Sequence, residues 1–320
     1  MSPLVSIIMP AYNAAKYIQE SIDSVYGQTW TDWELIIIND GSTDDTASIV
    51  KMNQLKCEKI ILIEQENKKQ AAARNSGLKI ARGTWIAFLD ADDVWAKNKL
   101  EVQLGFQNKA DVLFTSGTIL YESKNKKELY KTEYGFFPSA DMYAKLYTYN
   151  PIPNLAVLMK REWIDKIGYQ NESLDVVGCE DWEYWIRLAK NGATFFGIED
   201  QLFIYRIQSQ GTSRNLNRMR IAQAYAKYIN LDFSLLNKEH VQAYFKNLMQ
   251  PLINRLLESN QKKEALKQIR ILNEVTEESN YNLIQFLLNT GISINSKFLI
   301  YLAKPMLALR ALKRAFMQIK

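Results

Sequence analysis

Residues 4–13 read LVSIIMPAYN, and this stretch decides the fold because an apolar, β-branched run passes directly into a polar turn. Residues 34–42 (ELIIINDGS) and 85–93 (WIAFLDADD) repeat this arrangement. We expect strands at residues 4–9, 34–38, 59–63 and 85–89, with Pro10 ending the first, and helices at residues 14–26, 44–51 and 69–81. This alternation predicts βαβ units and a parallel sheet covered on both faces.

Polar residues follow three of the predicted strands at the point where each strand ends. They read Pro10-Ala11-Tyr12-Asn13, Asn39-Asp40-Gly41-Ser42 and Asp90-Ala91-Asp92-Asp93. In a parallel sheet, ligands bind in the crevice outside the carboxyl ends of the strands. The three clusters are therefore predicted to face one crevice.

The rest of the chain changes character twice. Between residues 111 and 206 the pattern is mixed, with strands expected near 112–121, 129–134, 155–159 and 201–206 and a helix at 180–190. Beyond residue 215 the chain is predicted to be helical almost to its end. A domain boundary is therefore expected there, between an α/β region at residues 1–214 and a helical region at residues 215–320.

Composition excludes several classes of protein. The 320 residues are 47% hydrophobic and 23% charged, as in ordinary globular proteins, and one His with two separated Cys excludes zinc enzymes and Ser-His-Asp hydrolases. The net charge of +5 is too small to indicate nucleic acid as a partner. No run reaches the length of a membrane span, and no Lys or Arg precedes the short apolar run near the N-terminus, so we expect a cytoplasmic protein.

Asp90, Asp92 and Asp93 place three carboxylates within four residues at a predicted strand end. Like charges this close raise one another's pKa unless a cation neutralises them, and oxygen ligands suit Mg²⁺ or Mn²⁺. A solvated acidic turn that caps a following helix is the alternative interpretation. The spacing of the three acids alone favours neither of these two interpretations.

Other polar residues of the predicted crevice have both a functional and an ordinary structural interpretation. Asp40 can accept from a base N–H, and Tyr12 and Asn13 can stack on and bond a nucleotide; all three also suit turns and caps. Arg74, inside a predicted helix, can reach an acidic crevice or a phosphate, or face solvent.

The helix predicted at residues 180–190 begins with Glu180 and Asp181. A carboxylate there can act as a general base, although the helix macrodipole favours acids at this position in any protein. The Tyr and Trp residues of 130–149 and 182–185 are interpreted as core, although sugar sites also use aromatic rings.

The motifs match a known family in order and spacing over residues 5–206, about two-thirds of the chain. The matching stretches are residues 5–13, 28–29, 34–46, 73–77, 81–83, 88–93, 180–182 and 187–188. They resemble glycosyltransferase family 2, the inverting nucleotide-sugar transferases of GT-A fold found in bacterial surface-polysaccharide biosynthesis. The resemblance implies a GT-A-like catalytic domain with a mixed, mainly parallel central sheet, followed by a helical C-terminal extension.

The resemblance also implies roles for individual residues. The nucleotide, usually UDP, would be held by Pro10, Tyr12, Asn13, Asp40 and Arg74. Asp90-Ala91-Asp92 would be the D-x-D motif, with Asp90 and Asp92 at a Mn²⁺ or Mg²⁺ ion and the diphosphate. Asp181 would be the base that takes the acceptor hydroxyl's proton, with Glu180 beside it.

Two positions depart from the pattern of the family. Asn39 stands where many relatives have a first acid, which loosens the expected ribose or base contacts. Gln208 stands where many relatives carry a His after Tyr205-Arg206, and in place of a His contact to the metal or diphosphate it would supply a weaker oxygen ligand.

Residues 292–320 carry basic residues interleaved with apolar ones, and no Asp or Glu follows Glu278. A basic amphipathic helix is typical of a membrane-surface element, and a helix packed on its own domain is the alternative. A lipid-linked acceptor at the inner face of a bacterial membrane would explain such a peripheral contact.

The expected reaction is the transfer of a sugar from a nucleotide sugar to a hydroxyl of a glycan or lipid-linked acceptor, with inversion. A sugar-phosphate nucleotidyltransferase is one alternative, but it requires a Gly-rich basic loop after the first strand, and Pro10-Ala11-Tyr12-Asn13 is not one. A non-catalytic glycan-binding relative is the other. Retention of Asp90, Asp92 and Asp181 disfavours it.

Overall fold

The computed structural model describes residues 5–208 and 216–277. The chain divides into two compact units, Met1–Arg214 and Asn215–Lys320. In its described part the second unit consists of helices α8 (Leu216–Ile229), α9 (Lys238–Glu258) and α10 (Lys262–Thr276). None of the helices in the described ranges is both long and apolar enough to cross a bilayer.

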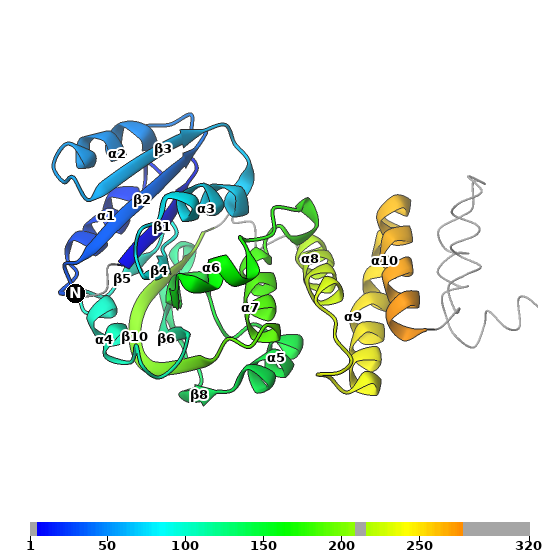
Figure 1. The fold of residues 1–320 in the computed structure, drawn as a ribbon. Helices are drawn as coiled ribbons and strands as arrows, with labels where there is room; N and C mark the ends of the chain where they lie inside the picture. The colour runs from blue at the N-terminus through cyan, green and yellow to red at the C-terminus, as the bar shows by residue number, and fades with distance from the viewer. Residues whose placement is uncertain (1–4, 209–215, 278–320) are drawn as a thin grey trace, which may run out of the picture. The chain divides into compact units, whose positions relative to one another are not determined.

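The first unit opens with a parallel, doubly covered half-sheet (Figure 1). Its elements are β1 (Val5–Ala11), α1 (Ile18–Tyr26), β2 (Trp33–Asp40), α2 (Thr46–Gln54), β3 (Ile60–Gln65), α3 (Lys69–Ile80) and β4 (Trp85–Phe88). The strands lie in the order β3-β2-β1-β4 and are parallel. Because parallel crossovers are right-handed, α1 and α2 lie on one face and α3, which leads back toward β4, on the other.

Pro10 does not end the first strand, contrary to expectation. β1 continues to Ala11, with Pro10 opposite Ile38 of β2. Pairing with β4 stops at Ile8, whose carbonyl accepts from the Leu89 N–H on that side. Pro10, two residues on, has its missing N–H on the same side, where no strand follows, so the sheet loses no hydrogen bond.

The sheet continues as a mixed half in the order β4-β9-β6-β10-β5. The further elements are β5 (Val94–Trp95), α4 (Lys99–Gly105), β6 (Val112–Tyr121), η1 (Glu122–Lys124), β7 (Lys126–Tyr130), β8 (Gly135–Phe137), α5 (Ser139–Thr148), η2 (Asn154–Ala156), β9 (Leu158–Lys160), α6 (Glu162–Ile167), η3 (Leu174–Val176), α7 (Glu180–Lys190) and β10 (Phe195–Ile207). Since β9 is antiparallel to both β4 and β6, these two strands run in one direction. The expected mixed, mainly parallel α/β sheet is confirmed.

The single strand expected at residues 129–134 is two short strands. β7 pairs with β6, and β8 pairs with β10. Between them the Thr132 N–H donates to Ser116 Oγ at 2.9 Å, and the chain passes so close to β10 that a Cβ on Gly197 would lie 1.8 Å from the Glu133 carbonyl oxygen. The change of partner strand interrupts the hydrogen-bonded ladder between the end of β7 and the start of β8. The local sequence pattern does not predict this change.

Helix α3 packs directly on the strands and thereby sets the position of the crevice residues that it carries. A Cβ on Gly77 would lie 2.8 Å from Ile38 Cδ1 and 3.0 Å from Ile8 Cγ2. The helix starts at the carboxyl edge of the sheet, where the Asp40 carboxylate accepts the Lys69 N–H. Arg74, in the second turn, is therefore fixed over this edge.

Candidate active site

Residues 90–93, here called the acid turn, follow β4 at the carboxyl edge, and the structure gives their carboxylates different surroundings. Asp93 is fully buried, and its Oδ1 accepts the Arg206 N–H of β10 at 2.7 Å. Burial, with the nearby charges of Asp92 and Asp90, raises the pKa of Asp93 well above its usual range. Asp93 therefore anchors the turn, and only Asp90 and Asp92 remain partly exposed.

Asp92 lies beside Gln208, which follows β10. The Gln208 side-chain amide donates to Asp92 Oδ2 at 2.6 Å. Burial and the charge of Asp90 raise the pKa of Asp92 to about 6, against the opposing effect of this hydrogen bond. The residue that departs from the family pattern thus lies in direct contact with the D-x-D motif.

Arg74 joins the acid turn to the start of α7. Its side chain is 3% exposed, with Nη2 at 2.7 Å from Asp90 Oδ1 and Nη1 at 3.5 Å from Glu180 Oε1. Glu180 is also buried, and its Oε2 accepts the Gly178 N–H at 2.5 Å. Both oxygens of Glu180 are occupied within the protein, so this residue holds Arg74 and the turn before α7.

Asp181 follows Glu180 at the partly buried start of α7. Burial and the charge of Glu180 raise the pKa of Asp181 to about 7, while Arg74 and the Trp182 N–H, 2.7 Å from Asp181 Oδ1, act in the other direction. A carboxylate with a pKa near neutrality is well matched to accepting a proton at physiological pH.

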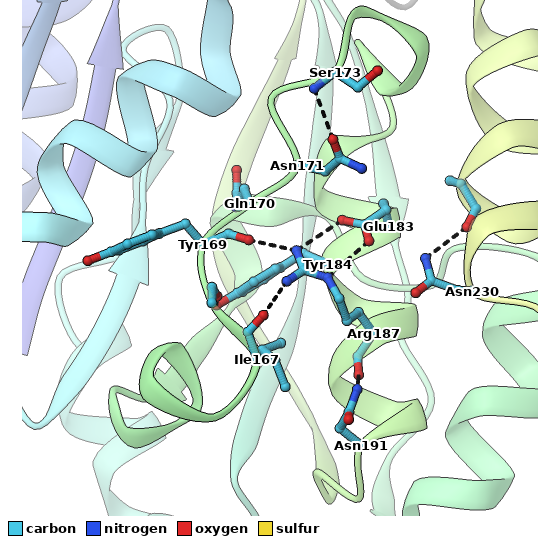
Figure 2. A network of polar contacts seen from close by, with 12 residues as sticks. Ile167, Tyr169, Gln170, Asn171, Ser173, Glu183, Tyr184, Arg187, Asn191 and Asn230 are labelled. Carbon is cyan, nitrogen blue, oxygen red and sulfur yellow. Dashed lines mark hydrogen bonds and ion pairs between the residues drawn. The ribbon is translucent and has the colours of Figure 1, made fainter.

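Helix α7 is held in place by a network that centres on Arg187 (Figure 2). Its guanidinium donates to the carbonyls of Ile167 at 2.5 Å and Tyr169 at 2.7 Å, and to Glu183 one turn earlier at 3.0 Å. The side chain of Asn75, next to Arg74 on α3, makes two hydrogen bonds to the backbone of Gln170. It donates to the Gln170 carbonyl at 2.8 Å and accepts the Gln170 N–H at 3.0 Å. The sequence pattern assigns Asn75 and Arg187 no role, because most of these contacts join residues 18 to 95 positions apart in the chain.

The residues that the resemblance assigns to the nucleotide differ in their exposure to solvent. Tyr12 is 54% exposed, whereas Pro10 and Ala91 are buried. Asn13, with a left-handed φ of 49°, uses its side-chain carbonyl to accept the Thr43 N–H at 2.8 Å. Its polar side chain therefore fixes the loop after β2 against the end of β1.

Asp40 is buried at the end of β2 and already has three donors. They are the Gln65 side chain at 2.7 Å, the Lys68 N–H at 2.9 Å and the Lys69 N–H at 3.0 Å. A carboxylate has about four lone-pair sites, so one acceptor position remains. Asn39 accepts the Ser42 N–H at 3.1 Å and so shapes the turn at Gly41, whose φ is +75°.

The carboxylate oxygens of the acid turn suit a hard divalent cation whose coordination is completed by a substrate. In the part of the chain that the structure describes, no group of three His, Cys, Asp or Glu side chains could hold a metal ion by itself. Mg²⁺ and Mn²⁺ are commonly bound by one or two carboxylates together with substrate phosphates. Asp90 and Asp92 offer such a pair of carboxylates, and both remain partly exposed at the carboxyl edge.

Replacing Gln170 with Met is expected to stabilise the protein. The side chain is 3% exposed, and neither of its amide atoms has a hydrogen-bond partner among the described residues. An unsatisfied buried polar group costs about 1–3 kcal/mol, so a side chain of similar shape without it should raise the free energy of unfolding by a similar amount. Urea denaturation measures this change, and a lower midpoint for Gln170→Met would contradict it.

A parallel half-sheet with a polar carboxyl edge, an Asp-Ala-Asp turn and a helix-start carboxylate joined to it through Arg74 agree with the GT-A-like fold that the resemblance implies. A family model described as glycosyl transferase family 2 matches residues 6–168, and the chain belongs to this family.

Relatives and solved structures agree with this assignment. The chain is 38% identical over 191 residues to the Escherichia coli UDP-Glc:alpha-D-GlcNAc-diphosphoundecaprenol beta-1,3-glucosyltransferase WfgD, covering 59% of this chain and 70% of that protein. S. aureus TarS in complex with UDP-GlcNAc has a TM-score of 0.62 at 17% identity, covering 94% of this chain and 90% of TarS. The mannosyltransferase PcManGT from Pyrobaculum calidifontis, with GDP-Man and Mn²⁺, has a TM-score of 0.57 at 18% identity over 97% of this chain and 87% of its own. The two structural likenesses show the fold.

Proposed function

We propose that this protein transfers a sugar from a UDP-sugar to a hydroxyl of a glycan or lipid-linked acceptor, with inversion at the anomeric carbon. The observation that carries the proposal is the ion pairing of Arg74 with Asp90 and with Glu180, directly before Asp181. It supports a single crevice in which the groups for the departing diphosphate and for the attacking hydroxyl are held together. Binding both substrates in one crevice supplies orientation.

The relatives support the choice of substrates. WfgD is named for UDP-Glc and a GlcNAc-diphosphoundecaprenol acceptor, TarS is solved with UDP-GlcNAc, and PcManGT is solved with GDP-Man and Mn²⁺. A nucleotide sugar as donor and a lipid-linked sugar as acceptor are therefore the first substrates to test here.

The residues at the ends of β1 and β2 are proposed to bind the nucleotide. Tyr12 offers an exposed ring on which a base can stack, and Asp40 keeps one acceptor position for a base N–H. Pro10 and Asn13 would act through the backbone and the loop that they shape, since Pro10 is buried and the Asn13 side chain is bonded to Thr43.

The acid turn is proposed to meet the diphosphate. Asp90 and Asp92 would hold Mg²⁺ or Mn²⁺, which when bound would neutralise charge on the departing diphosphate. Gln208 orients Asp92 through its amide N–H, and its carbonyl oxygen is proposed as a further ligand in place of the usual His. Arg74 holds Asp90 in position through the contact of its Nη2 with Asp90 Oδ1.

Asp181 is proposed to accept the proton of the acceptor hydroxyl as that oxygen attacks the anomeric carbon. Its pKa of about 7 allows it to be deprotonated under physiological conditions and still to take up a proton in the transition state. The bond to the diphosphate oxygen breaks as the new glycosidic bond forms. A single displacement from the face opposite the leaving group inverts the configuration.

Removal of the metal is expected to weaken donor binding. Titration calorimetry with UDP-glucose and UDP-GlcNAc should give tighter binding with Mn²⁺ or Mg²⁺ than in EDTA, and Asp92→Ala should abolish that gain. Glu58→Ala, at an exposed acid before β3, is the matched control and should keep it. Equal affinity in EDTA would contradict the metal assignment.

The same preparation distinguishes the proposed reaction from the alternatives. A transferase releases UDP in the presence of an acceptor, a nucleotidyltransferase releases pyrophosphate from UTP and a sugar phosphate, and a glycan-binding relative turns over neither. Release of UDP with a glycosylated product of inverted configuration, read by NMR, is the expected result.

A membrane contact through residues 292–320 is a further part of the proposal, although these residues lie outside the described ranges. Each basic residue near an anionic bilayer contributes about 1 kcal/mol. Full-length protein is expected to sediment with anionic liposomes and to be partly released by 1 M salt, where the Debye length falls to about 3 Å. A protein that ignores anionic liposomes would contradict a membrane role for this segment.

A further inference from the structure

Two tyrosines and a glutamate, here called the platform residues, have no part in the mechanism above. They are Tyr130, Glu133 and Tyr149. Tyr130 ends β7 opposite Gly117 of β6, and its ring centroid is 5.9 Å from that of Phe203. Because Gly117 has no side chain, the rings of Tyr130 and Phe203 can lie over β6 at this point.

Tyr149 follows α5 and is 46% exposed, yet it is fixed at its far end. Its hydroxyl donates to Glu133 Oε1 at 2.5 Å, and the Lys145 ammonium lies 2.5 Å from Glu133 Oε2. The ring is thus held at the surface with a carboxylate at its edge. Glu133 still has lone pairs for further donors, since a carboxylate accepts about four hydrogen bonds.

Sheet register brings Tyr130 to the carboxyl edge that carries the acid turn. Leu158 of β9 lies opposite Leu113 of β6 and opposite Ala87 of β4. Because β6 and β4 run in the same direction, both lead from this level toward the carboxyl edge of the sheet. Four residues beyond Leu113, β6 reaches Gly117, the partner of Tyr130, and three residues beyond Ala87 the acid turn begins at Asp90.

The platform residues also adjoin the proposed base. The Trp182 indole N–H donates to the Leu146 carbonyl at 2.8 Å, which ties the first turn of α7 to the helix that precedes Tyr149. Burial raises the pKa of Tyr130 to about 12, and the charge of Asp181 and then Tyr149 add to this effect. The hydrogen bond between Trp182 and Leu146 therefore places Tyr149 three residues from a contact with the turn that carries Asp181, and the pKa of Tyr130 agrees with this placement.

We propose that Tyr130, Glu133 and Tyr149 form the subsite for the terminal sugar ring of the acceptor, placing its hydroxyl at Asp181. A sugar ring presents an apolar C–H face to an aromatic surface and hydroxyls at its rim, and tyrosine offers a rigid, amphipathic contact for both. Glu133 is placed to accept from a rim hydroxyl. This inference rests on the proposed function, because it names where that reaction's acceptor binds.

The chain contains a matched control for this subsite. The Tyr121 hydroxyl donates to Glu128 Oε2 at 3.0 Å, and the Lys126 ammonium lies 2.5 Å from Glu128 Oε1, so the same three residue types make the same contacts. Tyr121 ends β6 opposite Ile207 of β10, four residues beyond Gly117, the partner of Tyr130. Tyr121→Ala therefore removes an equivalent ring from the same region outside the proposed subsite.

The experiment measures transfer from UDP-glucose and UDP-GlcNAc to octyl diphosphates that carry GlcNAc, glucose or GalNAc, together with the Kd for UDP in Mn²⁺. Tyr149→Ala and Tyr130→Ala should each raise the acceptor KM about tenfold or more and leave the Kd for UDP within about twofold. Tyr149→Phe, which keeps the ring and loses the bond to Glu133, should give a smaller rise. Tyr121→Ala should match the wild type.

Other outcomes separate the subsite from the proposed function. An unchanged acceptor KM in both alanine variants, or an equal loss of UDP affinity, would overturn the subsite. A wild type that hydrolyses the donors yet glycosylates none of the three acceptors would overturn it too. An effect seen with octyl diphosphates but absent with methyl glycosides of the same sugars would assign the tyrosines to the lipid instead. A wild type that neither binds nor turns over any nucleotide sugar would refute the proposed function itself.

Discussion

Replacing Asp181 with Asn is expected to slow sugar transfer about 10²–10⁴-fold, the usual contribution of a general base. The amide keeps the shape of the side chain but cannot take the proton of the acceptor hydroxyl. Donor affinity should remain close to that of the wild type, because the residue faces the acceptor in the proposed mechanism. Initial rates and calorimetry with UDP measure the two effects separately.

The pKa of Asp181 predicts how activity depends on pH. Since the base must be deprotonated, kcat/KM for the wild type should rise about tenfold per unit below pH 7 and level off above it. Glu180, Arg74 and Asp90 are the charged groups that set this pKa. A profile that is flat between pH 5.5 and 8 would argue against Asp181 as the base.

The same pKa predicts that Asp181→Asn gains stability while losing activity. The folded-state pKa of about 7 lies above the usual value of 3.8, so between these values the folded protein holds a proton that the unfolded chain lacks. Stability therefore falls as the pH rises through this window, and the neutral amide removes the loss. The variant should melt higher than the wild type at pH 8 and at the same temperature near pH 4. Asp165→Asn, at an exposed acid of α6, should change neither rate nor melting temperature.

Replacing Arg74 with Met should affect stability and donor binding together. Removing one partner of a buried ion pair leaves uncompensated charge, which here falls on Asp90 and on the buried Glu180. The cost for such pairs is about 3–5 kcal/mol, and the partial exposure of Asp90 places the expected loss at the lower end. Urea denaturation and UDP titration should both show a loss.

Arg74→Lys keeps the charge and is the matched variant. A lysine is a single point charge and cannot reach both carboxylates as a planar guanidinium does. We expect folded protein with weakened UDP binding and with its activity midpoint shifted to higher pH, because the ammonium of a shorter side chain holds the positive charge farther from Asp181 than the guanidinium does. Wild-type stability and affinity in Arg74→Met would show that the guanidinium has no such role.

The sequence by itself determined the parallel half of the sheet and the family. Apolar runs of strand length, helical spacing between them and polar residues at the strand ends are local patterns, and they place residues 10–13, 39–42 and 90–93 at one edge without any knowledge of packing. Strand β6 and helix α7 have the bounds that their patterns predict. The proposed roles of the site residues stay predictions from the resemblance.

Only the tertiary structure decided which carboxylates can act and which are structural. Asp93 accepts a backbone N–H of β10, Asp40 accepts one from the start of α3, and Glu180 contacts Arg74. The pKa values of Asp92 and Asp181, in contrast, are raised. The contacts of Asp40 with α3, of Glu180 with Arg74 and of Asp93 with β10 join residues 28 to 113 positions apart in the chain. Local pattern specifies the secondary structure to which a residue belongs, but burial and charge at a carboxylate depend on every segment that the fold brings against it.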